Sequence, residues 1–167
     1  MSEEHVVDFR DWLNEPIENY HDVVQPPVGH YRASVTRMDS GKSKSGTGWV
    51  GWYVQLKEPM KDVNPKEMEG VHLEMWEVPR ENGRVDKTTF WNTPYGKAEM
   101  RKTLISFGCP MSTPASEFIM ENEMLRGMPC IVGIGYSEEV LSDDDKKAGK
   151  VPRRFMEVTE FIGDAKK

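Results

Sequence analysis

Several short stretches of the chain alternate apolar and polar residues with a period of two, which is the pattern of half-buried β-strands. The pattern predicts five strands, at 30–38, 49–57, 70–78, 128–136 and 153–162. After the third of these comes Asn82-Gly83, a typical two-residue hairpin turn. We therefore expect the third strand to turn back along residues 84–91.

Helical periodicity is confined to three stretches. Residues 96–107 repeat apolar side chains at i, i+4 and i+7, and Gly108 follows where a C-terminal glycine cap belongs. Thr113-Pro114 is typical of a helix start and predicts a second helix. Residues 6–20 are expected to form a short helix that is broken at Pro16.

The order of these elements is three strands, helix, and two further strands. A five-stranded, partly open barrel with a helix between strands three and four is the layout of the OB-fold. The sequence therefore predicts a mainly β fold with inserted helices, as an OB-fold barrel. The pattern by itself leaves a β-sandwich or an α+β sheet open.

Residues 41–57 join a basic, glycine- and serine-rich segment to a strand with large aromatic residues. Alternation places Val50, Trp52, Val54 and Leu56 on the core side of this strand. The other side then carries Trp49, Tyr53 and Lys57. In the third strand, alternation turns Val71, Leu73 and Met75 inward and Trp76 outward.

Exposed aromatic rings beside mobile cations are suited to unpaired nucleic acid, because rings stack on bases and cations contact phosphates. The candidate stacking residues are Trp49, Tyr53 and Trp76. The candidate phosphate contacts are Arg32, Lys42, Lys44, Lys57, Arg84, Lys87, Arg153 and Arg154. The alternative is that the rings pack under a loop or a partner chain, and a slip of one residue would exchange the two faces. For Phe90, Trp91 and Tyr95 we favour a packing role beneath the helix.

The net charge of −6 is concentrated at one end of the chain. Residues 1–26 contain seven acidic side chains and a single basic one, Arg10, whereas the rest of the chain is neutral. Such an arm can be simply solvated, or it can compete for a cationic groove or bind a basic partner protein. Its Phe9, Trp12 and Leu13 indicate that it docks on a surface.

No motif in the sequence assigns catalytic chemistry. The four histidines lack metal-ligand spacing, the carboxylates are scattered, and the glycine-rich stretch 41–48 leads into a strand instead of a helix. Cys109 and Cys130 are interpreted as reduced structural thiols. We therefore expect a protein that is not an enzyme and has no metal or cofactor. No apolar run reaches the roughly 20 residues of a membrane span, and the N-terminus lacks a signal pattern, so a cytoplasmic location is expected.

Four short motifs resemble those of phage-type single-stranded DNA-binding proteins with an OB-fold. They are Pro27-Val28-Gly29-His30-Tyr31, Lys42-Ser43-Lys44-Ser45-Gly46, Phe107-Gly108, and Leu125-Arg126-Gly127-Met128-Pro129-Cys130-Ile131-Val132. The resemblance covers about residues 27–162 and implies a role in DNA replication or recombination. Many such proteins end in an acidic tail that recruits partners, and Gly163–Lys167 departs from that pattern.

The sequence therefore predicts an acidic arm, 1–26, an OB-fold nucleic-acid-binding domain, 27–163, and a short polar tail, 164–167. The expected function is sequence-tolerant binding of single-stranded DNA, with replication or recombination proteins as further partners of the acidic arm. Two alternatives remain at this point. One is a protein-interaction module of a replication or recombination complex, and the other is a small metal-dependent nuclease.

Overall fold

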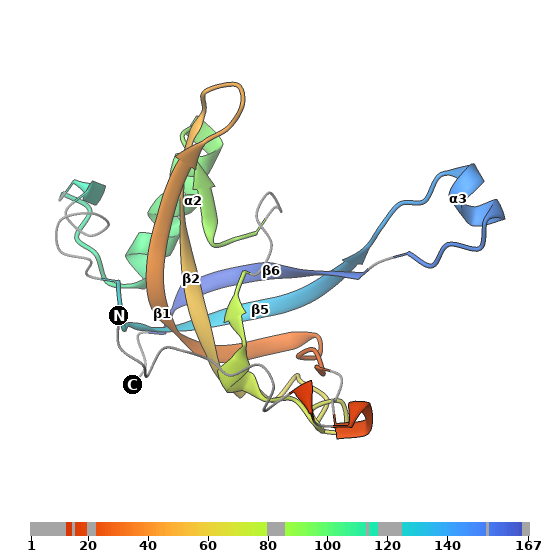
Figure 1. Ribbon diagram of the computed structural model, residues 1–167. Coiled ribbons are helices and arrows are strands. Elements are labelled where there is room, and N and C mark those ends of the chain that lie inside the picture. The colour runs from red at the N-terminus through yellow and green to blue at the C-terminus, as the bar shows by residue number, and fades with distance from the viewer. Residues whose placement is uncertain are drawn as a thin grey trace.

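The computed structural model describes residues 13–14, 16–19, 23–79, 86–112, 114–116, 125–152 and 154–164, and it is mainly β (Figure 1). In this part of the chain, six strands form one antiparallel sheet. They are β1 (Gly29–Lys42), β2 (Gly48–Pro59), β3 (Glu77–Val78), β4 (Thr89–Trp91), β5 (Pro129–Glu138) and β6 (Arg154–Gly163). The helical elements are η2 (Ile17–Asn19), η3 (Leu73–Met75), α2 (Pro94–Ser106) and α3 (Asp143–Lys147). Within the described ranges, no helix is long and apolar enough to cross a membrane.

The sheet has the strand order β3-β2-β1-β5-β6, and β4 also pairs with β2. The strands β3 and β4 lie along the same edge of β2, with Val78 opposite Val54 and Trp91 opposite Trp49. The residues just before β4 also contact β6. The backbone N–H of Lys87 donates to the Val158 carbonyl at 2.9 Å.

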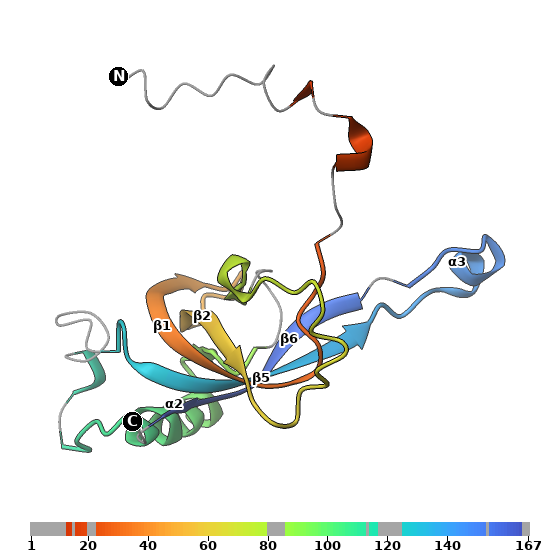
Figure 2. The same ribbon diagram turned by 90° about the horizontal axis from the view of Figure 1, so that it is seen from below.

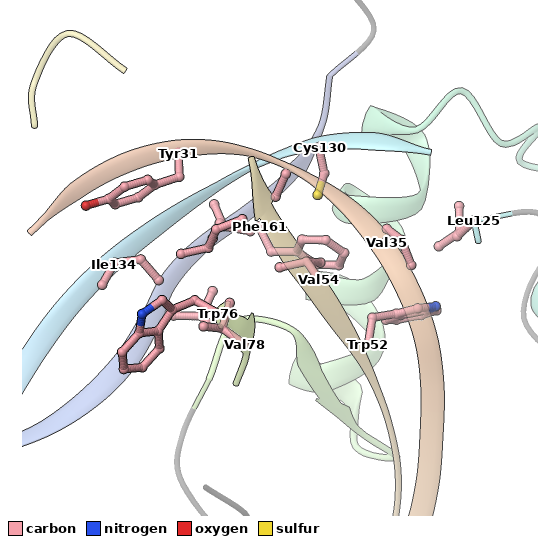
Figure 3. Close-up of a cluster of buried hydrophobic side chains, with 14 of the residues drawn as sticks. Tyr31, Val35, Trp52, Val54, Trp76, Val78, Leu125, Cys130, Ile134 and Phe161 are labelled. Atoms are coloured by element: carbon pink, nitrogen blue, oxygen red, sulfur yellow. The ribbon is translucent and has the colours of Figure 1, made fainter. Parts of the chain in front are cut away.

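The hydrophobic core lies on the side of β2 that alternation predicts. Trp52, Val54 and Leu56 are buried, and Val50 packs against them half-buried. Aromatic contacts extend the core across the sheet, since the ring centroids of Trp52 and Phe161 are 6.2 Å apart. Figure 3 shows this cluster between the strands. The predicted phase of the second strand is therefore confirmed.

The helix predicted at 96–107 is confirmed as α2. The Thr93 side chain accepts a hydrogen bond from the Gly96 backbone at 3.0 Å and caps the helix, and Pro94 occupies the first turn. Gly108 follows with φ = +84°, a left-handed conformation that glycine adopts without a steric penalty. Gly96 lies so close to β4 that an added Cβ would be 2.0 Å from the Trp91 carbonyl oxygen.

The third predicted strand is wrong for most of its length. Residues 73–75 form the 3₁₀ turn η3, and only Glu77 and Val78 pair as a strand. The side-chain amide of Gln55 donates to the carbonyls of Leu73 and Trp76 at 2.8 and 3.1 Å and supports the turn. Because a 3₁₀ turn breaks the period of two, Met75 is exposed and Trp76 is buried, opposite to the prediction.

The predicted return of the chain along 84–91 is confirmed in part. Residues 89–91 form β4, but they pair with β2 and not with residues 70–78. The Asn82-Gly83 turn lies outside the described residues. The second predicted helix is described only at 115–116, and most of the predicted helix within 6–20 also lies outside the described residues.

The last two predicted strands are confirmed as β5 and β6. The loop between them contains the short helix α3, capped by the Ser142 side chain. Figures 1 and 2 show that the β5–β6 hairpin carries α3 away from the rest of the sheet. Pro26 is buried, and its carbonyl accepts a hydrogen bond from the Tyr136 hydroxyl, so it packs with the body of the protein although we assigned it to the arm.

An ion pair ties the loop after β2 to the start of β1. The Nδ1 atom of His30 lies 2.7 Å from Oδ2 of Asp62, and the His30 backbone N–H donates to Oδ1 of the same carboxylate at 3.0 Å. Glu160 lies on the other side of the ring, 3.7 Å from Nε2. The bond to Asp62 raises the pKa of His30, and the same bond lowers the pKa of Asp62.

Replacing His30 by Asn should reduce stability in a pH-dependent way. Because the pKa of His30 is raised above 6.5, its protonated form stabilises the fold fully below about pH 6.5. This contribution is lost as the pH rises through the raised pKa. Both side chains are partly exposed, so we expect the variant to lose about 0.2–1 kcal/mol near pH 5 and less above neutrality. Urea unfolding at both pH values measures the difference, and a loss independent of pH would contradict the assignment.

Replacing Gly96 by Ala should destabilise the protein by about 1–3 kcal/mol, the cost of overpacking, because the new methyl group meets the β4 backbone. Helix propensity alone predicts the opposite, a gain of about 1 kcal/mol. Urea unfolding measures the sign of the change. Lys97→Ala, at the next and exposed position, is the matched control and should change stability by less than about 0.5 kcal/mol. A stabilised Gly96→Ala variant would refute the close packing of α2 on β4.

Candidate nucleic-acid interface

The side of β2 that faces away from the core carries a tryptophan on a floor of glycines. Trp49 is opposite Gly41 of β1, and a Cβ at Gly41 would lie only 3.0 Å from Cζ2 and Nε1 of the indole. A Cβ at Gly51 would lie 3.6 Å from Cζ3 of the same ring. The absence of side chains at both glycines therefore lets the indole lie close over the sheet.

Trp91 continues this row onto the next strand. It is the cross-strand partner of Trp49, and 41% of its surface is exposed. Directly opposed residues of antiparallel strands project from the same face, so the two tryptophans are neighbours on the outside of the sheet. We expected Trp91 to pack beneath the helix, and its exposure shows that this expectation was wrong.

Tyr53 lies four residues after Trp49 on the same face of β2, and an arginine covers its ring. The guanidinium carbon of Arg37 is 3.9 Å from the ring centroid, within the range of a cation–π contact. Glu77 of β3 holds the guanidinium, with Nη2 to Oε1 at 3.1 Å. Arg37 was not among the predicted site residues, and its position changes the expected role of Tyr53. Here we define the outer face as Arg37, Trp49, Tyr53 and Trp91.

Predicted cations flank this row at both ends. Lys57 is exposed near the end of β2 that lies beyond Tyr53. Lys44 is exposed in the turn that joins β1 to β2. Lys42 is opposite Gly48, and alternation therefore puts it on the same side as Val50, away from the outer face. An acidic residue, Asp39, shares the outer side with Arg37 and Trp49.

A groove of about 470 Å³ runs between the end of the β1–β2 hairpin and α2. The residues with large side chains that line it are Lys42, Trp49, Val50, Phe90, Trp91, Lys97 and Met100. Lys42, which is directed away from the outer face, therefore borders an apolar groove together with Lys97. Both tryptophans of the outer face also contribute to its wall.

Three predicted site residues lie apart from the outer face or are already engaged. Trp76 is only 5% exposed and packs in the core near Val78 and Ile134 (Figure 3), so its predicted stacking role is wrong. Arg32 is paired with the nearly buried carboxylate of Asp164 at 2.7 Å. Arg154 begins β6 on the projecting hairpin, with its guanidinium carbon 4.5 Å from the ring centroid of Tyr136.

Lys87 is exposed on the turn that precedes β4. Its backbone is held by Val158 of β6, which keeps it beside the strand that carries Trp91. The two remaining predicted cations, Arg84 and Arg153, lie outside the described residues.

No known protein-family model matches this chain. A search of the curated proteins also finds no match to it. Within the described residues, no group of three or more histidine, cysteine, aspartate or glutamate side chains is placed to hold a metal ion.

The structure adds residues that the sequence pattern did not assign to the site. Lys97 and Tyr95 belong to the first turns of α2, and Tyr95 is 70% exposed although we expected it to be packed. A hydrogen bond to Glu99 raises the pKa of the Tyr95 phenol. The sequence feature that indicates this exposure is the helix start at Thr93-Pro94, which places Tyr95 in the first turn of α2.

Replacing Gly41 by Ala should displace the Trp49 indole, because the new Cβ would lie 3.0 Å from two of its ring atoms. We expect a stability loss of about 0.5–1.5 kcal/mol, the cost of an off-rotamer side chain. Labelling tryptophan with ¹⁵N and recording the indole N–H resonances should show a shift for Trp49, assigned with a Trp49→Phe variant.

Gly48→Ala is the matched control, because the nearest atom to its added Cβ, outside the adjoining residues, is 3.9 Å away. This variant should leave the Trp49 resonance in place. Equal shifts in the two variants would show that the indole does not rest on Gly41.

Proposed function

We propose that this protein binds single-stranded DNA without strong sequence preference, and that this binding supports DNA replication or recombination. The bases stack on the outer face, and the phosphates contact lysines beside it. The observation that carries the proposal is the pair of neighbouring tryptophans, Trp49 on its glycine floor and the exposed Trp91, close to the lysine-bearing turn of the β1–β2 hairpin.

Stacking explains why such a surface accepts any sequence. Every base has a π-face, and each base–aromatic stack contributes about 1–3 kcal/mol. Trp49 and Trp91 present two such surfaces from adjacent strands. Arg37 supplies a third planar surface, since a guanidinium that covers one ring can itself stack a base.

The proposed architecture is an OB-fold barrel, in which β3 and β4 together take the place of the third strand. The strand order supports this assignment, because strand one pairs with strands two and four in that fold, as β1 pairs with β2 and β5. The hydrogen bond from Lys87 to Val158 supports closure between the third and fifth strands. In OB-folds the face of strands two and three binds oligonucleotides, and here that face includes Trp49, Tyr53 and Trp91.

The charges around the outer face favour binding that depends only weakly on salt. Lys44 and Lys57 add positive charge, whereas Asp39 lies on the same side and Glu77 compensates Arg37. Two lysines beside the outer face imply that stacking supplies a large part of the affinity. Because each phosphate contact contributes about 0.7 to the salt slope for single strands, contacts from both lysines predict a shallow slope of about 1.4.

A second candidate function is a protein-interaction module, which the exposed apolar residues beside α2 favour. Tyr95, Ile105 and Met111 are exposed there, and the residues around them line apolar hollows. Protein interfaces are enriched in tyrosine, methionine and arginine at their centres. This surface adjoins the outer face but has fewer neighbouring aromatic rings to stack bases.

Titrating the protein with an oligothymidine at two salt concentrations tests the proposed function. We expect quenching of tryptophan fluorescence that weakens with salt, and little quenching by duplex DNA. Trp49→Ala and Trp91→Ala should each weaken binding by about 5- to 150-fold, the range of one lost stack.

Two charge variants serve as matched controls. Lys44→Gln should lower the salt slope by about 0.7, whereas Lys66→Gln, at an exposed lysine in the loop after β2, should leave it unchanged. Asp39→Asn should strengthen binding, because it removes a repulsive carboxylate from the outer side. Absence of binding at low salt would reject the proposal, and cleavage of the strand with magnesium present would favour the nuclease alternative.

A further inference from the structure

A second hollow of about 220 Å³ adjoins the groove between the hairpin and α2. The two share Lys97 and Met100, so they form one continuous depression along the helix, which we call the α2 groove. Its apolar lining includes Phe90 and Leu104, and Met111 is exposed at its far end. Contiguous apolar surface of this kind marks an interaction site.

The described charged residues of the α2 groove are all basic. They are Lys42, Lys97 and Arg101, and none of the described residues that line the groove is acidic. An occupant that fits this surface combines large apolar side chains with carboxylates. The groove therefore selects for an acidic, amphipathic segment.

The N-terminal arm of the same chain has this chemistry. Residues 1–26 contain seven acidic side chains and one basic one, and Phe9, Trp12 and Leu13 lie between the carboxylates. Leu13 is 56% exposed and Ile17 is 82% exposed, so the described part of the arm presents apolar side chains to solvent. The acidic helix α3 is a weaker match, because Lys146, Lys147 and Lys150 follow its aspartates directly.

The length of the arm permits docking within one chain. The arm joins the body at Pro26, which is buried and bonded to Tyr136. Ile17 lies nine positions before Pro26. At about 3.4 Å per position this tether extends to about 31 Å, comparable with the roughly 30 Å diameter of a small domain. A tethered segment also has an effective concentration of about millimolar, which favours its own groove over that of a second copy.

We propose that residues 9–17 of the arm dock in the α2 groove of their own chain. The rings of Phe9 and Trp12 enter the apolar hollows, and Asp11 and Glu15 lie beside the cations of the groove. The docked state is a second conformation in which apolar surface of the arm and apolar surface of the groove cover each other. This docking goes beyond the proposed function and does not require that the outer face binds DNA.

Cys109 provides a reporter in the native chain, because it lines the α2 groove and is half-buried. Cys130 is fully buried, and burial raises its pKa to about 12. The rate at which N-ethylmaleimide labels each thiol can be followed in the full-length protein by mass spectrometry of its peptides. Labelling of Cys109 then measures how often the groove is open, and labelling of Cys130 reports unfolding.

Trp12→Ala combined with Leu13→Ala should raise the labelling rate of Cys109 by at least about tenfold, since burying one such side chain changes an equilibrium constant by about that factor. The rate of Cys130 should stay unchanged. Val28→Ala, which removes an exposed apolar side chain outside the segment, is the matched control and should change neither rate. Added salt should raise the wild-type rate of Cys109, because it screens the charge pairing.

An equal Cys109 rate in wild type and the double variant would overturn the proposal. Protection that increases with protein concentration would also overturn it, because the occupant would then come from a second copy. A triple variant of α3 tests the other acidic segment. If Cys109 loses its protection when Asp143, Asp144 and Asp145 are all replaced by Asn, but keeps it in the Trp12→Ala, Leu13→Ala variant, then α3 occupies the groove and the proposal is overturned. Concentration-independent protection that depends on Trp12 and Leu13 supports docking within the chain.

Discussion

The central constraint in this structure is the phase of β2, which is hydrogen-bonded along both edges. One edge pairs with β1, and the other pairs with β3 and β4. Because successive side chains point to opposite faces, the burial of Trp52, Val54 and Leu56 determines that Trp49 and Tyr53 face outward. A slip of one residue would exchange the two sets, so the core and the proposed interface depend on the same register.

Local patterns were sufficient to predict β1, β2, β5, β6 and α2, because the period of each element and the caps of α2 lie within the element itself. They were insufficient for residues 70–78. An alternating stretch there forms a 3₁₀ turn because Gln55, distant in sequence, binds its carbonyls. The error in Trp76 follows directly, since its predicted outward direction assumed a continuous strand.

In the candidate site, too, local patterns predict some residues, whereas others depend on contacts between distant parts of the chain. Trp49 and Tyr53 were predicted because they share a strand, and their face is a local property. Arg37 and Trp91 join them only through cross-strand pairing, which a single sequence does not specify. Arg32 shows the opposite case, since a carboxylate 132 residues away engages a cation that the sequence presents as available. Long-range pairing therefore decides which aromatic and charged residues remain accessible.

The arrangement of charge bears on the proposed binding of DNA by an acidic chain. The seven acidic residues of the arm, together with its single basic residue, account for the net charge of −6, whereas the α2 groove and the hairpin carry cations. On the outer side, however, Asp39 and the Arg37–Glu77 pair leave little uncompensated positive charge. Electrostatic attraction at physiological salt is then weak beyond a Debye length of about 8 Å. Under the proposed function, the affinity for a single strand therefore comes mainly from stacking on the tryptophans, which requires unpaired bases.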